Sequence, residues 1–444
     1  MTIVSAMTRL PRRPVLALAL ALVAVTSIPA SAGAVHGRSA STRLQGGVNV
    51  VSPRNGLSLA EADHAVAQAK ALHAKLIRTD VQWALFQPSG PGSTDPQVLA
   101  FTDRLVSDAT AAGIHVVMTV EGSPCWASSA PASTLSECSP AALSAANAWP
   151  PSDPSTYAAF AAFLVQRYGT QLAALEVWNE PDQSNEHYFA GPHKAVRYAA
   201  VLRAAYTAIK AANPNVPVLG GSLVGSNGAF LRTLYAAGIK GYYDGLSVHF
   251  YTLTLASLRA IHETQLANGD DTPLWLAEFG WTSCWPHVHI QQEQGCVTAQ
   301  TQASNLTNSL REMARMPYVA AAVAYKLQDN IGENFGMLSA SGAHKPSFAG
   351  VARALTAPFG PVSPVLVKLR AHGGRVIVSG SGPVGDFMEL EVFNGSRLRY
   401  TSIFTLNRFN KYSLTLPSVL GTGGLRVRVF QYLSGSAHAA QKSI

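Results

Sequence analysis

The sequence is poor in charged residues and contains no apolar run long enough to cross a lipid bilayer. Of its 444 residues only 13% are charged and 48% are hydrophobic. This balance excludes an intrinsically disordered chain and is sufficient for one large core and a smaller unit. No glycine-rich phosphate loop follows the first expected strand, and no repeat of solenoid type is visible. These absences argue against a dinucleotide-binding sheet and a repeat array.

The first 32 residues differ from the rest of the chain. Three arginines within the first 13 residues precede an apolar run from Val15 to Val25, and Ala30-Ser31-Ala32 has the small-x-small form of a cleavage site. The run is too short to span a bilayer, so we expect a secretory signal peptide over residues 1–32, removed after Ala32. An uncleaved anchor is the alternative. The mature protein is therefore predicted to be secreted, without a membrane span.

Cysteine is also scarce, with only four in the chain. They form two close pairs, Cys125 with Cys138 and Cys284 with Cys296. Three connectivities are possible, and in an exported chain we favour the two local disulfides, because each would close a single loop. Two histidines within five residues after Cys284 make a zinc site the alternative, but no CxxC spacing supports it. We therefore expect no metal and no cofactor.

The net charge of +8 is unevenly distributed along the chain. Residues 361–444 contain ten Lys and Arg against three acidic residues, and the first 32 residues contain three arginines and no acid. The remaining main body is nearly neutral, which makes nucleic acid a poor candidate as a partner.

Strand-like runs alternate with helical segments through the main body. The strand-like runs are 47–50, 75–78, 115–119, 175–178, 217–220, 246–249, 274–277 and 320–325. Ser58 and Glu61 have the spacing of a capping box and predict the start of the helix behind the first run. Eight such units predict an α/β fold, a closed (β/α)8 TIM barrel over residues 33–356. An open doubly wound sheet is the alternative.

The composition and the periodicity of the sequence change after the expected barrel. A proline-rich linker over residues 357–364 precedes short runs with a period of two, "MELEVF", "YSLTLP" and "LRVRVF", separated by glycine-rich turns. This pattern predicts a small antiparallel β-sandwich over residues 365–444. Its surplus of Lys and Arg suggests docking to an anionic polymer of a cell wall; a role in packing alone is the alternative.

Two acidic residues follow strand-like runs on opposite sides of the expected barrel. In "LEVWNEPD" Asn179 and Glu180 follow the fourth run, and in "LWLAEFGW" Glu278 follows the seventh. Side chains at the carboxyl ends of barrel strands surround one pocket, so the two glutamates should face each other. A lone glutamate after a strand is often only a solvated loop residue. A facing pair suits cleavage of a glycosidic bond, with one carboxyl protonating the leaving oxygen while the other attacks or activates water.

The motifs "VWNEPD" and "LAEFGW" resemble the acid/base and nucleophile motifs of clan A of the glycoside hydrolases. The resemblance continues in "LIRTDVQW", "GLSVHFY" and "RYGTQLAALEVWNEP", covers roughly residues 46–356, and is strongest to family 39 and related secreted bacterial enzymes. It implies a (β/α)8 barrel in which Glu180 is the general acid/base and Glu278 the nucleophile.

The same resemblance implies roles for four neighbouring residues. Asn179 would hydrogen-bond the 2-hydroxyl of the sugar. Arg78 and Tyr251 would each donate to Glu278 and keep it ionised, and His249 would orient either the acid or the substrate. A buried ion-pair residue and a satisfied core histidine are the plain alternatives for Arg78 and His249.

Four tryptophans lie in the expected loops after strands three and seven, where their rings could stack on sugars: Trp126, Trp149, Trp281 and Trp285. We select Trp281 and Trp126 as substrate-binding candidates, although most tryptophans belong to a core. The sequence departs from the clan at the end of the eighth strand, where Tyr325 and Lys326 replace a common tryptophan, and at Asp182, where Asn is frequent. These departures leave the sugar open.

The pattern as a whole predicts a retaining glycoside hydrolase that acts on a β-linked glycan, by a double displacement between carboxyl groups about 5–5.5 Å apart. A non-catalytic carbohydrate-binding protein on a similar barrel is one alternative. A metal-dependent barrel hydrolase is another, but we find no ligand set of the His-x-His kind at a strand end. Endo and exo action are not distinguished by the sequence.

Overall fold

The computed structural model describes residues 44–54, 56–140, 142–251, 254–283, 297–314, 316, 318–330, 332–356, 365–382, 387–405, 411–431 and 440–444. The expected signal peptide, the pair Cys284 and Cys296 with the neighbouring Trp285, and the expected linker 357–364 lie outside the described residues. Among the described residues, no helix is both long and apolar enough to cross a membrane.

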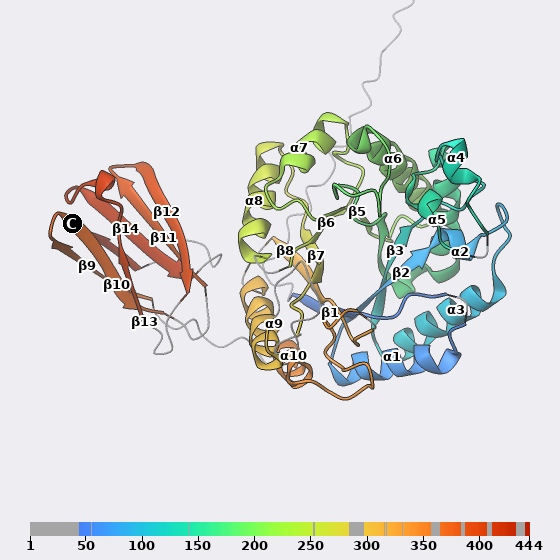
Figure 1. Ribbon diagram of the computed structural model, residues 1–444, viewed down its shortest axis with the longest axis horizontal. Coiled ribbons are helices and arrows are strands. Elements are labelled where there is room, and N and C mark those ends of the chain that lie inside the picture. Colours follow the sequence, from blue (N-terminus) through green and yellow to red (C-terminus); the bar gives the residue numbers. More distant parts are fainter. Residues whose placement is uncertain are drawn as a thin grey trace, which may run out of the picture. The chain divides into compact units, whose positions relative to one another are not determined.

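Eight parallel strands close into a barrel, because β1 pairs with both β2 and β8 (Figure 1). The strands are β1 Gln45–Asn49, β2 Leu76–Gln82, β3 His115–Glu121, β4 Leu172–Val177, β5 Val218–Leu223, β6 Gly245–His249, β7 Leu274–Phe279 and β8 Val319–Ala324. Each overlaps the run expected at its place in the chain, and the predicted (β/α)8 barrel is confirmed.

Helices surround the barrel (Figure 1). They are α1 Leu59–Ala71, α2 Trp83–Phe86, α3 Pro96–Ala111, α4 Ala132–Leu135, α5 Pro154–Tyr168, α6 Lys194–Ala212, α7 Ala229–Ala236, α8 Thr254–Ala267, α9 Ala299–Met313 and α10 Pro346–Thr356, with 3-10 turns η1 Ala145–Ala148, η2 Gly169–Gln171 and η3 Ser418–Leu420. The capping box of Ser58 and Glu61 is present at the start of α1. At α3, Asp95 accepts from the first free N–H groups and Pro96 occupies a position where no N–H is needed.

Inside the barrel the side chains change from apolar to polar along each strand. Leu76, Val117 and Ala174 belong to a buried apolar cluster within the ring. Because side chains alternate along a strand, the inward positions two residues further on are Arg78, Thr119 and Glu176, and these three are buried and joined by hydrogen bonds. The apolar layer thus closes the amino end of the barrel, and the polar layer above it supports the carboxyl end.

The C-terminal strands form two antiparallel sheets, in the orders β13-β10-β9 and β12-β11-β14-β15. Their bounds are β9 Leu366–His372, β10 Arg375–Ser381, β11 Phe387–Asn394, β12 Arg397–Thr405, β13 Lys411–Thr415, β14 Leu425–Gln431 and β15 Ala440–Ser443. Alternate residues such as Val378, Leu390 and Val427 are fully buried in one apolar cluster to which both sheets contribute. The predicted antiparallel β-domain is confirmed.

Candidate active site

Glu180 and Glu278 lie at the same end of the barrel. Glu180 is three residues beyond the end of β4, and Glu278 is the second-last residue of β7. Their exposed fractions are only 5% and 6%. One oxygen of each carboxyl and a ring nitrogen of His249 lie within 4.8 Å of one another. Trp178 and Glu180 both have left-handed backbone, with φ of 67° and 45°. Such strain is seldom retained outside functional sites, and here it lies directly beside the paired carboxyls.

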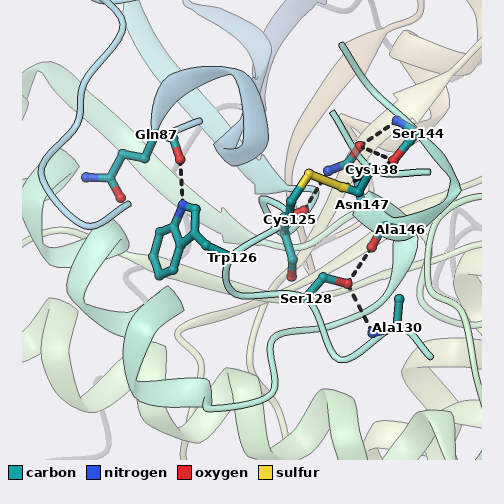
Figure 2. Close-up of a disulfide and its surroundings, with 10 residues drawn as sticks. Gln87, Cys125, Trp126, Ser128, Ala130, Cys138, Ser144, Ala146 and Asn147 are labelled. Atoms are coloured by element: carbon teal, nitrogen blue, oxygen red, sulfur yellow. Dashed lines mark hydrogen bonds between the residues drawn. A yellow bond between two sulfur atoms is a disulfide. The ribbon is translucent and has the colours of Figure 1, made fainter. Parts of the chain in front are cut away.

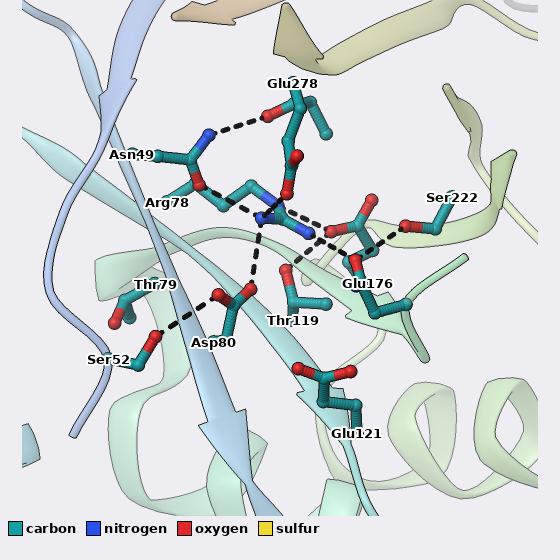
Figure 3. A network of polar contacts seen from close by, with 12 residues as sticks. Asn49, Ser52, Arg78, Thr79, Asp80, Thr119, Glu121, Glu176, Ser222 and Glu278 are labelled. Carbon is teal, nitrogen blue, oxygen red and sulfur yellow. Dashed lines mark hydrogen bonds and ion pairs between the residues drawn. The ribbon is translucent and has the colours of Figure 1, made fainter. Parts of the chain in front are cut away.

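Arg78 lies between three carboxylates and is completely buried (Figure 3). Its Nη1 donates to Glu278 Oε1 at 2.7 Å, its Nε donates to Glu176 Oε2 at 2.8 Å, and Nη1 is 3.0 Å from Asp80 Oδ1. Nη1 also donates to Asn49 Oδ1 at 3.0 Å. A buried cation is tolerated only when it is paired in this way, so Arg78 neutralises and orients the nucleophile candidate Glu278.

Glu176 is the second buried partner of Arg78. Its carboxylate also accepts from the hydroxyl of Thr119, at 2.6 Å, and from the hydroxyl of Ser247. Burial alone would raise the pKa of Glu176, but the charge of Arg78 and the hydrogen bonds of the carboxylate hold it well below its ordinary range. Glu176 therefore remains charged and holds the guanidinium in place.

Both oxygens of Glu278 are held by donors. Arg78 donates to Oε1, and the hydroxyl of Tyr251 donates to Oε2. Burial raises the pKa of Tyr251, and the charge of Glu278 raises it further. Tyr251 therefore keeps its proton over the physiological range, and the carboxylate of Glu278 has a fixed orientation.

His249, the last residue of β6, connects the two glutamates. Its Nδ1 is 3.0 Å from Glu180 Oε1 and 3.6 Å from Glu278 Oε2, and its Nε2 is 3.0 Å from Ser222 Oγ. Burial lowers the pKa of the ring, but the charge of Glu278 and hydrogen bonds with Glu176 and Glu180 outweigh it and raise the pKa to about 10. The ring is thus protonated at neutral pH and donates from Nδ1 to Glu180.

The three atoms within 4.8 Å of one another also have the spacing of a metal-ligand set, two carboxylates and one imidazole. A metal ligand must be deprotonated, whereas His249 is protonated at neutral pH. The oxygens of Glu278 are already engaged by Arg78 and Tyr251. The donors therefore fit a hydrogen-bonded proton site better than a metal centre, and the expectation of no metal stays a prediction.

Asn179 is held in the site through the oxygen of its side-chain amide. Its Oδ1 accepts from Arg78 Nη2 at 3.2 Å and lies 3.5 Å from the Oγ of Ser222, which donates to it. With the oxygen engaged, the amide hydrogens remain for a substrate hydroxyl. Glu180 accepts a hydrogen bond from Gln183 Nε2 as well as from His249. The acid candidate therefore has a fixed orientation too.

More carboxyl groups than cations gather at this end of the barrel. Burial raises the pKa of Asp80, against the lowering effect of Arg78. Burial also raises the pKa of Glu121, at the end of β3, to about 8, and the negative charges of Asp80 and Glu180 act in the same direction. Gln82 Nε2 donates to Glu121 Oε1 at 2.5 Å. Glu121 is therefore a protonated carboxyl at neutral pH.

The loop between β3 and α5 contains the disulfide Cys125–Cys138, which is present as predicted, with an S–S distance of 2.03 Å (Figure 2). Asn147 Nδ2 donates to the carbonyl of Ser123 at 2.7 Å, and the N–H of Ser123 donates to the carbonyl of Asn147 at 3.0 Å. The indole of Trp126 donates to the carbonyl of Gln87 at 2.8 Å. The loop is thus cross-linked within itself and is joined to the residue that follows α2 through Trp126.

Six of the predicted site residues form one connected cluster: Arg78, Asn179, Glu180, His249, Tyr251 and Glu278. The two selected tryptophans take no part in these contacts. Trp281 is 7% exposed within the main core, and the ring of Trp126 packs edge-on against Trp83 at 5.4 Å between centroids. Their contacts with sugar stay predictions. Lys326 pairs with Glu333, so its charge is already compensated.

Several residues of this site were not predicted from the sequence, among them Asp80, Glu121, Glu176 and Ser222. A usable signal existed for the three acids, because each interrupts or ends an apolar strand run. Ser222 gave no such signal. It is fully buried, with a φ of 53°, and only the fold brings it to His249.

Solved structures of glycoside hydrolases resemble this chain in fold. A GH5_18 structure from Streptomyces cattleya in complex with GlcNAc is 19% identical, covers 73% of this chain and 83% of its own, and has a TM-score of 0.52. A family 39 glycoside hydrolase from Bacteroides cellulosilyticus WH2 is 19% identical, with coverages of 85% and 80% and a TM-score of 0.53. A monomeric beta-xylosidase from Caulobacter crescentus CB15 is 16% identical, with coverages of 92% and 98% and a TM-score of 0.53.

At these identities the structural likeness shows the fold alone, and no curated protein matched the chain. The family model that matches is Cellulase (glycosyl hydrolase family 5), over residues 46–308. The sequence had pointed most strongly to family 39, whose structures are among the similar ones; the clan that it indicated is confirmed. The chain therefore belongs to glycosyl hydrolase family 5 and, with it, to clan A of the glycoside hydrolases.

Proposed function

We propose that this protein is a secreted, retaining glycoside hydrolase that cleaves β-glycosidic bonds in an oligosaccharide or polysaccharide. The main support is the approach of Glu180 and Glu278 at the carboxyl end of one barrel, with an oxygen of each within 4.8 Å. Retaining enzymes have carboxyl groups about 5–5.5 Å apart, and inverting enzymes about 6.5–9.5 Å. Secretion rests on the arginine-rich, apolar first 32 residues.

The first half of the reaction uses the fixed orientation of both carboxyls. Glu278, ionised and held by Arg78 and Tyr251, attacks the anomeric carbon and forms a glycosyl ester, while Glu180 gives a proton to the departing oxygen. The amide of Asn179 donates to the 2-hydroxyl, a contact that strengthens in the transition state. No group has to move far, since each already has its hydrogen-bond partners.

The second half regenerates the enzyme. Glu180, now a carboxylate, takes a proton from water, whose oxygen attacks the anomeric carbon and releases Glu278. His249 Nδ1 lies 3.0 Å from Glu180 Oε1, and its N–H donates a hydrogen bond that stabilises the charge left on Glu180. Two inversions at one carbon give net retention.

The test is a screen of the purified protein against β-linked polysaccharides and aryl glycosides, followed by proton NMR of the first-formed sugar before mutarotation. We expect the product to keep the anomeric configuration of the substrate. Glu180→Gln and Glu278→Gln serve as inactive controls that preserve size. An inverted product would contradict the roles given to both glutamates, and binding without turnover would favour the non-catalytic alternative.

We further propose that the C-terminal domain docks the enzyme to an anionic cell-wall polymer. Lys368, Arg370 and Arg375 are exposed on the β9–β10 hairpin, and Arg397 and Arg399 are exposed at the start of β12. Deleting residues 361–444 should reduce retention on an acidic polysaccharide at low salt, and salt should have the same effect on the intact protein. Retention that is insensitive to salt would contradict electrostatic docking, and retention that the deletion leaves unchanged would favour a role in packing alone.

A further inference from the structure

The three-stranded sheet β13-β10-β9 of the C-terminal domain has an inner and an outer face. Val376, Val378 and Tyr412 are buried in the apolar cluster of this domain, and Leu369 packs against it. Because side chains alternate along a strand, the residues between them point to the other side of the sheet. This outer face consists of the even-numbered residues of β9 and the odd-numbered residues of β10 and β13. All of them are exposed or partly exposed.

Three cations of the outer face have no partner among the residues that the structure describes. They are Lys368 and Arg370 of β9 and Arg375 of β10, and all three are exposed. The outer face itself holds no acidic residue. Among the described residues of this domain the acids are Glu389 and Glu391 of β11, and both are buried in the other sheet. The three positive charges are therefore available to an anion from outside the domain.

The three cations stand in successive rows across the strands. The pairing of β9 with β10 places Lys368, Arg370 and the pair of His372 and Arg375 one row apart from one another. Rows on one face are two residues apart, about 7 Å along a strand, so the three charges extend over about 14 Å. Lys411 adds a fourth cation on the edge strand β13. A small anion reaches only one or two of these charges, whereas a linear polymer with one negative charge per repeat can contact all three rows.

The neighbours of these cations restrict the chemistry of the polymer. Ser379 and Ser413 lie in the row of Lys368, and Thr415 lies in the row of Arg370. Their hydroxyls can donate to anionic oxygens. The outer face holds no Phe, Tyr or Trp, and every one of its positions is described. Bases are held by stacking on such rings, and sugar rings are commonly held in the same way. The outer face therefore suits a flexible chain of charged groups better than a chain of bases or sugar rings.

A phosphodiester polymer with polyol units meets these conditions. Its charge lies in the backbone, so each repeat presents an anion to the sheet whichever way the chain is turned, whereas the charges of a polyuronate are fixed to stiff rings. The guanidinium groups of Arg370 and Arg375 match the paired oxygens of a phosphate, and the ammonium group of Lys368 binds one as a point charge. We propose that the outer face binds a linear phosphodiester polymer of a cell wall along the line of these three cations. The inference rests on the proposed docking of this domain to an anionic cell-wall polymer.

Two triple variants of the full chain compare the outer face with the rest of the domain. Each removes three exposed cations by substitution with glutamine, which keeps part of the side-chain stem. The outer-face variant carries Lys368→Gln, Arg370→Gln and Arg375→Gln. The control variant, on strands β12 and β15 of the other sheet, carries Arg397→Gln, Arg399→Gln and Lys442→Gln. Since all six positions are exposed, both variants should keep the unfolding temperature of the intact protein.

Binding of each protein to poly(glycerol phosphate) is measured over a range of salt concentrations. In a flexible phosphodiester chain each contact contributes about −0.7 to the slope of log K against log salt concentration, so the intact protein should show a slope of about −2. In the outer-face variant the slope should fall close to zero, and the affinity at low salt should fall at least about tenfold. The control variant should keep the slope of the intact protein and an affinity within about threefold of it.

Polygalacturonate, oligo-dT and vesicles of phosphatidylglycerol are the competing probes, and each should bind the intact protein more weakly at the same salt concentration. Equal slopes in the two variants would overturn the assignment to the outer face, and a competing probe that binds as tightly as poly(glycerol phosphate) would overturn the choice of polymer. Either result would leave the docking of the domain standing.

Docking itself fails, and this inference with it, if the intact protein binds none of the four probes or if deletion of residues 361–444 leaves binding unchanged. Turnover of a β-linked glycan by both triple variants should match that of the intact protein, because the outer face and the paired glutamates belong to different domains. A failure of the hydrolase proposal is therefore recognised separately.

Discussion

Replacing Glu121 by Gln should make the protein more stable at neutral and alkaline pH, and by an amount that grows with pH. Glu121 is 7% exposed, and its pKa is raised from 4.5 to about 8, first by burial and then by the charges of Asp80 and Glu180. A glutamine has nearly the same shape as the protonated carboxyl, and its carbonyl oxygen can still accept from Gln82. The substitution therefore removes the titration and keeps the packing.

The direction in which the free energy of unfolding changes with pH follows from proton binding in the folded and unfolded states. Between pH 4.5 and about 8 the folded state keeps the proton of Glu121 and the unfolded state releases it, so the free energy of unfolding falls as the pH rises. One pH unit corresponds to about 1.4 kcal/mol for one proton. The contribution of Glu121 to stability is thus greatest below pH 4.5, and above about pH 8 that contribution, several kcal/mol, is lost. Glu121→Gln should escape this loss.

The assay is urea unfolding of the protein and of Glu121→Gln, followed by tryptophan fluorescence, at about pH 4.5, 6.5 and 8.5. Near pH 4.5 the two free energies of unfolding should agree within about 1 kcal/mol, and at pH 8.5 the variant should be more stable by at least about 2 kcal/mol. Glu137→Gln, at an exposed position just after α4, controls for the loss of one surface charge. A difference that stays constant with pH would refute the titration of a buried carboxyl.

Three other changes probe the reacting centre. Glu278→Ala should lower turnover at least about a hundredfold without unfolding the barrel, and azide should restore part of the activity on an activated aryl glycoside; a smaller loss would contradict its role as nucleophile. Ser222→Ala and Ser222→Gly should lower kcat/KM alike, because both lose the hydroxyl beside His249. Only the glycine should raise the unfolding temperature, since it relieves a left-handed backbone that costs about 1–2 kcal/mol; activity lost in the alanine variant alone would point to strain instead. A chelator should leave activity unchanged, because His249 holds a proton where a metal would bind, and inhibition that zinc reverses would contradict this.

The barrel could be predicted because its signals are local. Each strand-like run is apolar, short and followed by a helical segment, and a capping residue such as Ser58 or Asp95 marks where a helix begins. The topology of such a fold then places every strand end at one pocket. Glu180 and Glu278, 98 residues apart in the chain, are brought together by that rule alone.

What the sequence could not show is how charge is shared. Whether Arg78 pairs with one carboxylate or with several depends on which side chains point inward, and a shift of one residue would reverse every orientation. The contact of Ser222 with His249 likewise depends on a left-handed residue at the end of β5. A serine rarely adopts the left-handed backbone conformation, and no local sequence pattern predicts it.

The inward residues of β2, β3 and β4 explain why the reactive groups are so firmly oriented. The first layer, Leu76, Val117 and Ala174, is apolar and excludes water below the site. The second layer, Arg78, Thr119 and Glu176, is polar, buried and fully hydrogen-bonded. Because every member of the second layer has its hydrogen-bond partner within the barrel, the donors and charges of the site at the carboxyl end are held in fixed positions. Organisation of this kind before the substrate arrives is what makes electrostatic stabilisation of a transition state effective.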